Sequence, residues 1–338
     1  SGDTGASATF LTLGLIYFSV MLIAAFSYRV PPKDWKPDGW TPQPDGAKTM
    51  ITKNHVHIDQ ALKTPQFWQL WIMLCFNVTA GIGVIGVAKT MVSEIFGSNA
   101  VLIEMATTST LVLLFFAKYV VMLSAFNMVG RFIWASTSDY IGRKNTYHCF
   151  FVLGAILYSS IPFFALQASA DPTTVLYFAG FCIASMIIFT MYGGGFATIP
   201  AYLADMFGTM HVGGIHGRLL TAWSTAGVIG PVAIAQLRQL SVNNSLDNLM
   251  TKIDPSKFLE KFGAPVEKID ELVKAKTVTI SKLMEIAPEG TLDPTPSLYN
   301  TTMYAMLGLL LIAFFSNLLI KPVHSKHYVE NTHPGTLK

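Results

Sequence analysis

The sequence predicts an all-α, multi-pass membrane protein with seven spanning helices, and three observations support this prediction. Of the 338 residues, 51% are hydrophobic and only 13% are charged, and the mean hydropathy is +0.46. Soluble chains carry about 25% charged residues, because a folded surface must be hydrated. Seven apolar segments reach the roughly 20 residues that a helix needs to cross a bilayer, and they lack the two-residue alternation of strands.

The seven expected helices are separated by loops of contrasting charge. They are Ala8–Tyr28, Phe67–Ala88, Ser109–Thr137, His148–Ala168, Thr174–Leu203, Leu219–Leu237 and Leu298–Ile320. The composition argues against a soluble enzyme and a disordered chain. The net charge of +3 is small and spread along the chain, so we expect no nucleic-acid partner.

Lysine and arginine residues orient these helices in the cell (plasma or inner) membrane. Six of them lie between Arg29 and Lys63, two more in the loop Asp139–Tyr147, and three in the tail. The alternate loops Val92–Thr108 and Gln167–Thr173 contain none. Because cytoplasmic loops are rich in basic residues, we expect four segments in the cytoplasm, namely Arg29–Gln66, Asp139–Tyr147, Ala204–Arg218 and the tail.

The chain divides into one helix, a linker and a block of six helices. Residues 30–66 contain six prolines and few apolar residues, which is typical of a cytoplasmic linker. We therefore expect residues 1–29 to be the last helix of an N-terminal bundle, and residues 67–338 to be a C-terminal six-helix bundle. Residues 238–297 mix eight basic with nine acidic residues, so we expect a small folded insert there, on the outer face.

One helix followed by six is natural if five helices have been lost from the front of a longer protein. The chain starts at Ser1 without an initiator methionine, and no basic segment precedes its first apolar stretch. We therefore infer no signal peptide and expect the N-terminal half to be missing.

Charged side chains within the spans are candidates for function, because each is costly in the bilayer. Arg131 lies about 12 Å along its helix from Asp139 and shares a face with Ser124 and Asn127. A guanidinium can hold a carboxylate through two hydrogen bonds, so Arg131 is a candidate substrate ligand with Asn127 beside it. The alternative is a structural arginine that bonds carbonyls or a carboxylate of the missing half. Lys118 and Lys89 are expected to snorkel.

Glycine and aromatic residues mark the fifth and sixth spans. Tyr192 and Phe196 flank three consecutive glycines, and Trp223 lies in the sixth span. The glycines predict either close helix packing or a cavity with Tyr192 and Phe196 as its aromatic wall. Glycines at 81, 83 and 86 match the dinucleotide-binding spacing, but they lie inside a span with no strand before them. We expect no cofactor, no metal and no catalytic residue.

The loop Ser138–Lys144 (SDYIGRK) resembles the signature between adjacent helices of the major facilitator superfamily. In that superfamily a loop aspartate, a glycine and a basic pair form a cytoplasmic gate. The resemblance thus implies gating roles for Asp139, Gly142, Arg143 and Lys144. Tyr140 and Ala135 depart from the usual pattern.

A wider resemblance, to the oxalate/formate antiporter family, runs from about Ala8 to the tail without the insert. It rests on Lys63–Trp68 (KTPQFW), Asn127–Lys144, Tyr192–Thr209 and the linker segment Pro31–Pro37 (PPKDWKP). It implies helices six to twelve of a twelve-helix carrier, with the missing N-terminal half as a partner.

The same resemblance implies site residues. Arg131 matches the substrate-binding arginine of that family, and Tyr192 and Phe196 match aromatic cavity residues. Trp223 stands where an oxalate-specific member has a lysine. Two cations suit a dicarboxylate, whereas one arginine beside an aromatic ring suits a monocarboxylate better, which puts oxalate in doubt.

We therefore predict a secondary transporter of small organic anions, namely a monocarboxylate such as formate, pyruvate or lactate, or oxalate. It would work by alternating access, and the lack of acidic residues deep in the spans favours exchange. The alternative is a seven-helix receptor, which the long linker and the gate motif disfavour. A membrane-embedded enzyme lacks any His/Asp/Glu/Ser constellation within the spans.

Overall fold

The computed structural model describes residues 5–29, 32, 35, 38–39, 50–97, 102, 104, 110–171 and 175–329, without the side chains of residues 110–118 and 169. These residues are helical apart from turns and connecting segments, and they contain one isolated β-bridge, between Val56 and Tyr328, and no strand. The all-α class predicted from composition is thus confirmed.

Among the residues that the structure describes, seven helices are long and apolar enough to cross a membrane, and each coincides with one expected span. The long helices are α1 (Ala6–Ser27), α3 (Pro65–Phe96), α5 (Thr110–Ile141), α6 (Arg143–Ala170), α7 (Leu176–Phe207), α9 (Thr221–Met250) and α13 (Asn300–Leu319). The short ones are α2 (Ile58–Ala61), α8 (Val212–Leu219), α10 (Pro255–Phe262), η1 (Val266–Lys268), α11 (Ile269–Lys274), α12 (Ile280–Met284), η2 (Thr295–Ser297) and η3 (Ser325–His327).

The chain forms two compact units, residues 1–48 and 49–338. The first contains α1, which buries none of its side chains within the unit. It is apolar on every side, as expected of a helix surrounded by lipid or by other apolar helices.

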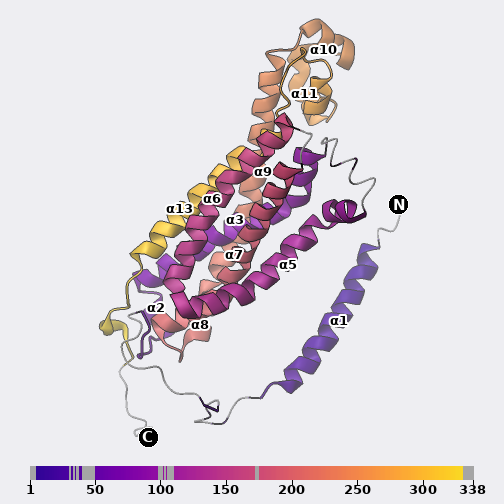
Figure 1. Cartoon of the computed structure of the whole chain (residues 1–338). Coiled ribbons are helices and arrows are strands. Elements are labelled where there is room, and N and C mark those ends of the chain that lie inside the picture. Colours follow the sequence, from indigo (N-terminus) through magenta and orange to yellow (C-terminus); the bar gives the residue numbers. More distant parts are fainter. Residues whose placement is uncertain are drawn as a thin grey trace. The chain divides into compact units, whose positions relative to one another are not determined.

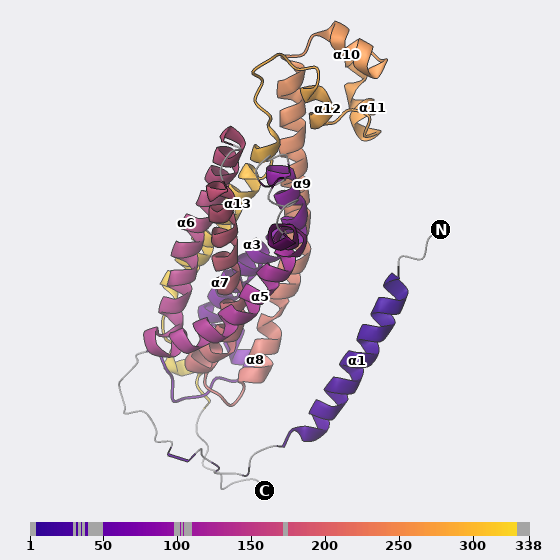
Figure 2. The same cartoon turned by 45° about the vertical axis from the view of Figure 1, so that its right-hand side comes forward.

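The second unit is a bundle of the other six long helices. Helix α7 packs mainly against α5 and α6, α3 packs mainly against α9 and α13, and α13 also packs against α6. Helices α10, α11 and α12 lie beyond one end of this bundle, and α8 lies at the other end (Figures 1 and 2).

Helix α9 continues well past the expected span end at Leu237, as far as Met250. The insert therefore begins as a helical extension of the bundle rather than as a loop. Its next helix, α10, starts at Pro255 after Asp254, whose carboxylate accepts a hydrogen bond from the Ser256 amide. Such capping satisfies an amide that the first helical turn leaves free.

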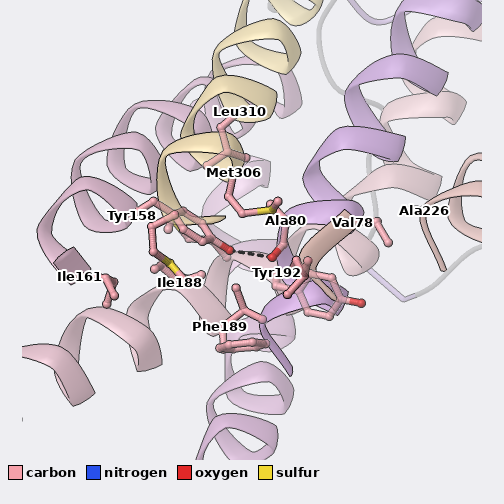
Figure 3. Close-up of a cluster of buried hydrophobic side chains, with 14 of the residues drawn as sticks. Val78, Ala80, Tyr158, Ile161, Ile188, Phe189, Tyr192, Ala226, Met306 and Leu310 are labelled. Atoms are coloured by element: carbon pink, nitrogen blue, oxygen red, sulfur yellow. Dashed lines mark hydrogen bonds between the residues drawn. The ribbon is translucent and has the colours of Figure 1, made fainter. Parts of the chain in front are cut away.

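The core joins five helices around Tyr158 and Tyr192 (Figure 3). The Tyr158 hydroxyl donates to the carbonyl oxygen of Ala80 at 3.0 Å, which links α6 to α3. Helix association in lipid depends on close packing and on such interhelical hydrogen bonds, since lipid is as apolar as the side chains themselves.

The three consecutive glycines of α7 allow close packing against α5 and α3. A Cβ atom at Gly193 would lie 1.9 Å from the Asn127 carbonyl oxygen of α5. A Cβ atom at Gly195 would lie 2.9 Å from the Asn77 side chain of α3, and the Gly195 carbonyl accepts from Tyr147 of α6. These glycines therefore allow close helix packing, and α7 remains one continuous helix through Pro200. The cavity wall of Tyr192 and Phe196 stays a prediction.

Candidate functional site

The crossing of α5 and α7 positions the candidate substrate residues. Gly130 lies directly against α7, because a Cβ atom there would be 2.1 Å from the Thr190 carbonyl oxygen. Arg131 is the next residue after Gly130. Asn127 lies three residues before Gly130, almost one helical turn away, and is beside Gly193. The glycines thus let α5 approach α7 closely enough for Arg131 to reach aromatic residues of that helix.

Arg131 and three aromatic side chains form a continuous row, which we call the aromatic row. The Arg131 guanidinium carbon lies 5.9 Å from the centroid of the Phe196 ring. Phe196 contacts Trp223 of α9, with ring centroids 4.3 Å apart, and Tyr192, with centroids 5.3 Å apart. Residues predicted from three separate spans are therefore neighbours.

The aromatic row runs from the buried core of the bundle to its exposed surface. Tyr192 is buried at its inner end, Phe196 is half-buried, and Trp223 is 40% exposed. Arg131 is exposed, and none of the described carboxylates lies within ion-pair distance of it. Among the described residues, therefore, no carboxylate competes with an incoming anion for the positive charge of Arg131.

The loop between α5 and α6 holds the predicted gate residues. Arg143 pairs with Asp139 at 2.5 Å, lies 3.6 Å from Asp205 at the end of α7, and donates to Ser138. Gly142 has φ +86°, a backbone conformation that favours glycine, and it allows α6 to begin directly after α5. Asp205 was not among the predicted gate residues, because it lies 62 positions from Arg143 in the sequence.

Lys144 lies apart from this ion-pair group. Its ammonium donates to the carbonyl oxygens of Leu318 and Ile320, at 3.0 and 2.7 Å, where α13 ends. Cations stabilise the carbonyl end of a helix. The contacts of Lys144 thus anchor α13, and its gating role stays a prediction.

A second polar group lies at the other end of the bundle, and sequence analysis missed it. Glu94 of α3 pairs with Arg238 of α9, and the Tyr299 hydroxyl donates to Glu94 at 2.6 Å while it accepts from Arg238 at 3.1 Å. The sequence did not identify Glu94 as a residue of a spanning helix, because the expected span ends at Ala88, whereas α3 continues to Phe96. Of the two lysines expected to snorkel, Lys89 is exposed, and the side chain of Lys118 lies outside the described residues.

Comparisons with known proteins agree with the resemblance drawn from the loop motif. The family model of the Major Facilitator Superfamily matches residues 2–231. An oxalate:formate antiporter of Oxalobacter formigenes is 29% identical over 229 residues, which cover 67% of this chain and 46% of that protein. The chain thus spans about half the length of this curated relative. The superfamily consists of multi-pass membrane transporters, not of enzymes. With a match over more than half of its length, the chain belongs to the major facilitator superfamily.

Proposed function

We propose that this chain is part of a secondary transporter of small organic anions that works by alternating access. The observation that carries the proposal is Arg131, exposed beside the aromatic row without a carboxylate partner among the described residues. The similarity to an oxalate:formate antiporter supports an anionic substrate. Membership of the superfamily argues against the alternative of a seven-helix receptor.

Arg131 would hold the substrate carboxylate, with Asn127 beside it. Tyr192, Phe196 and Trp223 would shape the adjoining wall of the cavity. A bidentate arginine–carboxylate pair is strong when water is excluded, and aromatic side chains beside it exclude water. We favour a monocarboxylate such as formate, pyruvate or lactate over oxalate, because Trp223 supplies no second positive charge.

Asp139, Gly142, Arg143 and Lys144 would form the gate at the end expected to be cytoplasmic. The Arg143 pairs with Asp139 and Asp205 support this role, since they join the loop after α5 to the end of α7. Opening the gate would then require these ion pairs to separate. Arg143→Gln should lower the maximal transport rate more than it changes the KM, because Arg143 lies away from the aromatic row.

Uptake by the full-length carrier in lipid vesicles tests the substrate assignment. Labelled formate, pyruvate, lactate and oxalate would be compared for the unchanged protein, Arg131→Ala and Arg131→Lys. Arg131→Ala should abolish uptake, and Arg131→Lys should retain part of it because the charge remains. Arg218→Ala is the matched control, since Arg218 is equally exposed but lies on α8. Unchanged uptake by Arg131→Ala would remove Arg131 from the site.

A second measurement separates exchange from proton symport. Vesicles loaded with unlabelled substrate should take up labelled substrate much faster than empty vesicles if the carrier exchanges anions. A symporter would instead respond to an imposed pH gradient in empty vesicles. The second result would overturn exchange and leave the anion site untouched.

A further inference from the structure

Three exposed lysines gather where α13 ends and α3 begins. They are Lys63, which precedes α3, and Lys321 and Lys326 of the segment that follows α13. We call these three residues the rim lysines. They lie at the end of the bundle that the distribution of basic residues assigns to the cytoplasm.

Specific contacts hold this segment against the start of α3. The Gln66 side-chain amide donates to the carbonyl oxygens of Lys321 and Pro322, at 3.1 and 3.2 Å. Further along, the Val329 amide donates to the His55 carbonyl at 2.8 Å, next to the β-bridge of Val56 and Tyr328. The rim lysines are therefore brought together by the fold, although 258 positions separate Lys63 from Lys321.

The positive charge of this region is not neutralised by nearby acids. Within the described part of the chain, none of the rim lysines forms an ion pair. Of the acids at this end, Asp139 and Asp205 engage Arg143, and Asp59 lies 3.5 Å from His57. Desolvation lowers the pKa of His327, and the charges of Lys326, His324 and Lys63 lower it further. This shift reflects the mutual proximity of the cationic groups.

Exposed apolar side chains occupy the helix turns that the rim lysines flank in the sequence. Trp68 in the first turn of α3 is 51% exposed, and Phe315, Leu318 and Leu319 in the last turns of α13 are at least half exposed. A tryptophan at this position is typical of the boundary between hydrocarbon and headgroups. We therefore expect the rim lysines at headgroup level, with the exposed apolar turns of α3 and α13 extending from them into the hydrocarbon region.

We propose that the rim lysines bind the phosphate headgroup of an anionic phospholipid whose acyl chains lie along α13. The combination of unpaired cations with an exposed apolar helix face fits a lipid better than a soluble phosphate, which would use only the charges. Basic groups next to spanning helices attract anionic lipids on the cytoplasmic side, and each contributes about fivefold near the surface. This proposal is independent of the transported substrate.

Spin-labelled lipids test the proposal with the full-length carrier in phosphatidylcholine vesicles. Electron spin resonance would measure the protein-bound fraction of labelled phosphatidylglycerol relative to labelled phosphatidylcholine. We expect severalfold selection of phosphatidylglycerol by the unchanged protein. The triple variant Lys63→Gln/Lys321→Gln/Lys326→Gln should lose most of this selection. The matched control Lys257→Gln/Lys268→Gln/Lys274→Gln removes three equally exposed lysines of the insert and should retain it.

Two results would overturn the proposal. One is a failure of the rim variant to lose more of the phosphatidylglycerol selection than the control variant loses. The other is loss of the selection when inorganic phosphate replaces chloride at constant ionic strength, which would identify a site for free phosphate instead. Thermal unfolding of both variants verifies that they fold, since all six side chains are exposed.

Discussion

Replacing Gly130 by alanine tests whether close contact between α5 and α7 builds the candidate site. The added Cβ atom would lie 2.1 Å from the Thr190 carbonyl oxygen, whereas ordinary contact begins at 3.4 Å. The two helices would have to separate locally by the difference, 1.3 Å. Overpacking of this kind costs about 1–3 kcal/mol, and the better helix propensity of alanine offsets up to about 1 kcal/mol. Because the clash is with backbone atoms of Thr190, the cost lies at the upper end of this range, and we expect a net loss of about 2 kcal/mol.

Gly308→Ala provides the matched control in α13. No described heavy atom lies within 4 Å of a Cβ atom at Gly308, so alanine there should leave stability unchanged or raise it by up to about 1 kcal/mol. Thermal unfolding of the full-length carrier in detergent should show a lower midpoint for Gly130→Ala only. Its KM for the anion should also rise, because Arg131 adjoins the displaced contact. Equal midpoints for the two variants would refute the role assigned to this crossing.

Three further predictions concern polar contacts away from this crossing. Asn317→Leu should destabilise the carrier by about 2–3 kcal/mol in thermal unfolding, because the buried amide accepts from Tyr202 and its loss leaves partners unpaired. Glu94→Gln should cost about 1–2 kcal/mol in the same assay, since Arg238 is only 28% exposed and would lose its counter-charge. Acidification below about pH 6.5 should lower the protection factors of the amides in residues 324–329, measured by hydrogen exchange relative to the intrinsic rate at each pH, because the lowered pKa of His327 means that protonation favours the detached segment.

Each of these predictions has its own control and contradicting result. The control for Asn317→Leu is Tyr304→Phe, which changes an exposed residue of α13 and should leave the unfolding midpoint unchanged. If Asn317→Leu also left the midpoint unchanged, the prediction for Asn317 would be contradicted. Glu94→Gln combined with Arg238→Gln should be milder than Glu94→Gln alone, and an additive loss would argue against the pair. His327→Gln should remove the pH dependence of these protection factors, so that a persisting dependence would assign it to another group.

Much of the fold could be predicted from the sequence, because a spanning helix is recognised from the hydropathy of its own residues, whatever it packs against. All seven spans coincide with observed helices, from α1 to α13. The start of α10 at Asp254 and Pro255 was also predictable, since helix capping is local. Arg131 could be proposed as a ligand because an arginine inside a span is unusual whatever its neighbours are.

Contacts between distant segments could not be predicted in the same way. Glu94 and Arg238 lie 144 positions apart, and hydropathy placed Glu94 in a loop rather than in α3. The motif around Lys144 suggested a gate, but its ammonium bonds to the end of α13, whose position depends on the packing of the whole bundle. A glycine run such as that at Gly193 likewise predicts close approach without identifying the neighbouring helix.

Because α9 runs without a break from the bundle into the insert, a small tilt of the helix in the bundle displaces the insert by a larger distance, which spectroscopy can measure. From Pro231 to Met250 the helix measures about 28 Å, so a 10° tilt about Pro231 would displace its tip by about 5 Å. A fluorophore on the insert would thus amplify rearrangements occurring at membrane depth. Watching that tip on single molecules offers a direct view of the transport cycle without touching the residues that perform it.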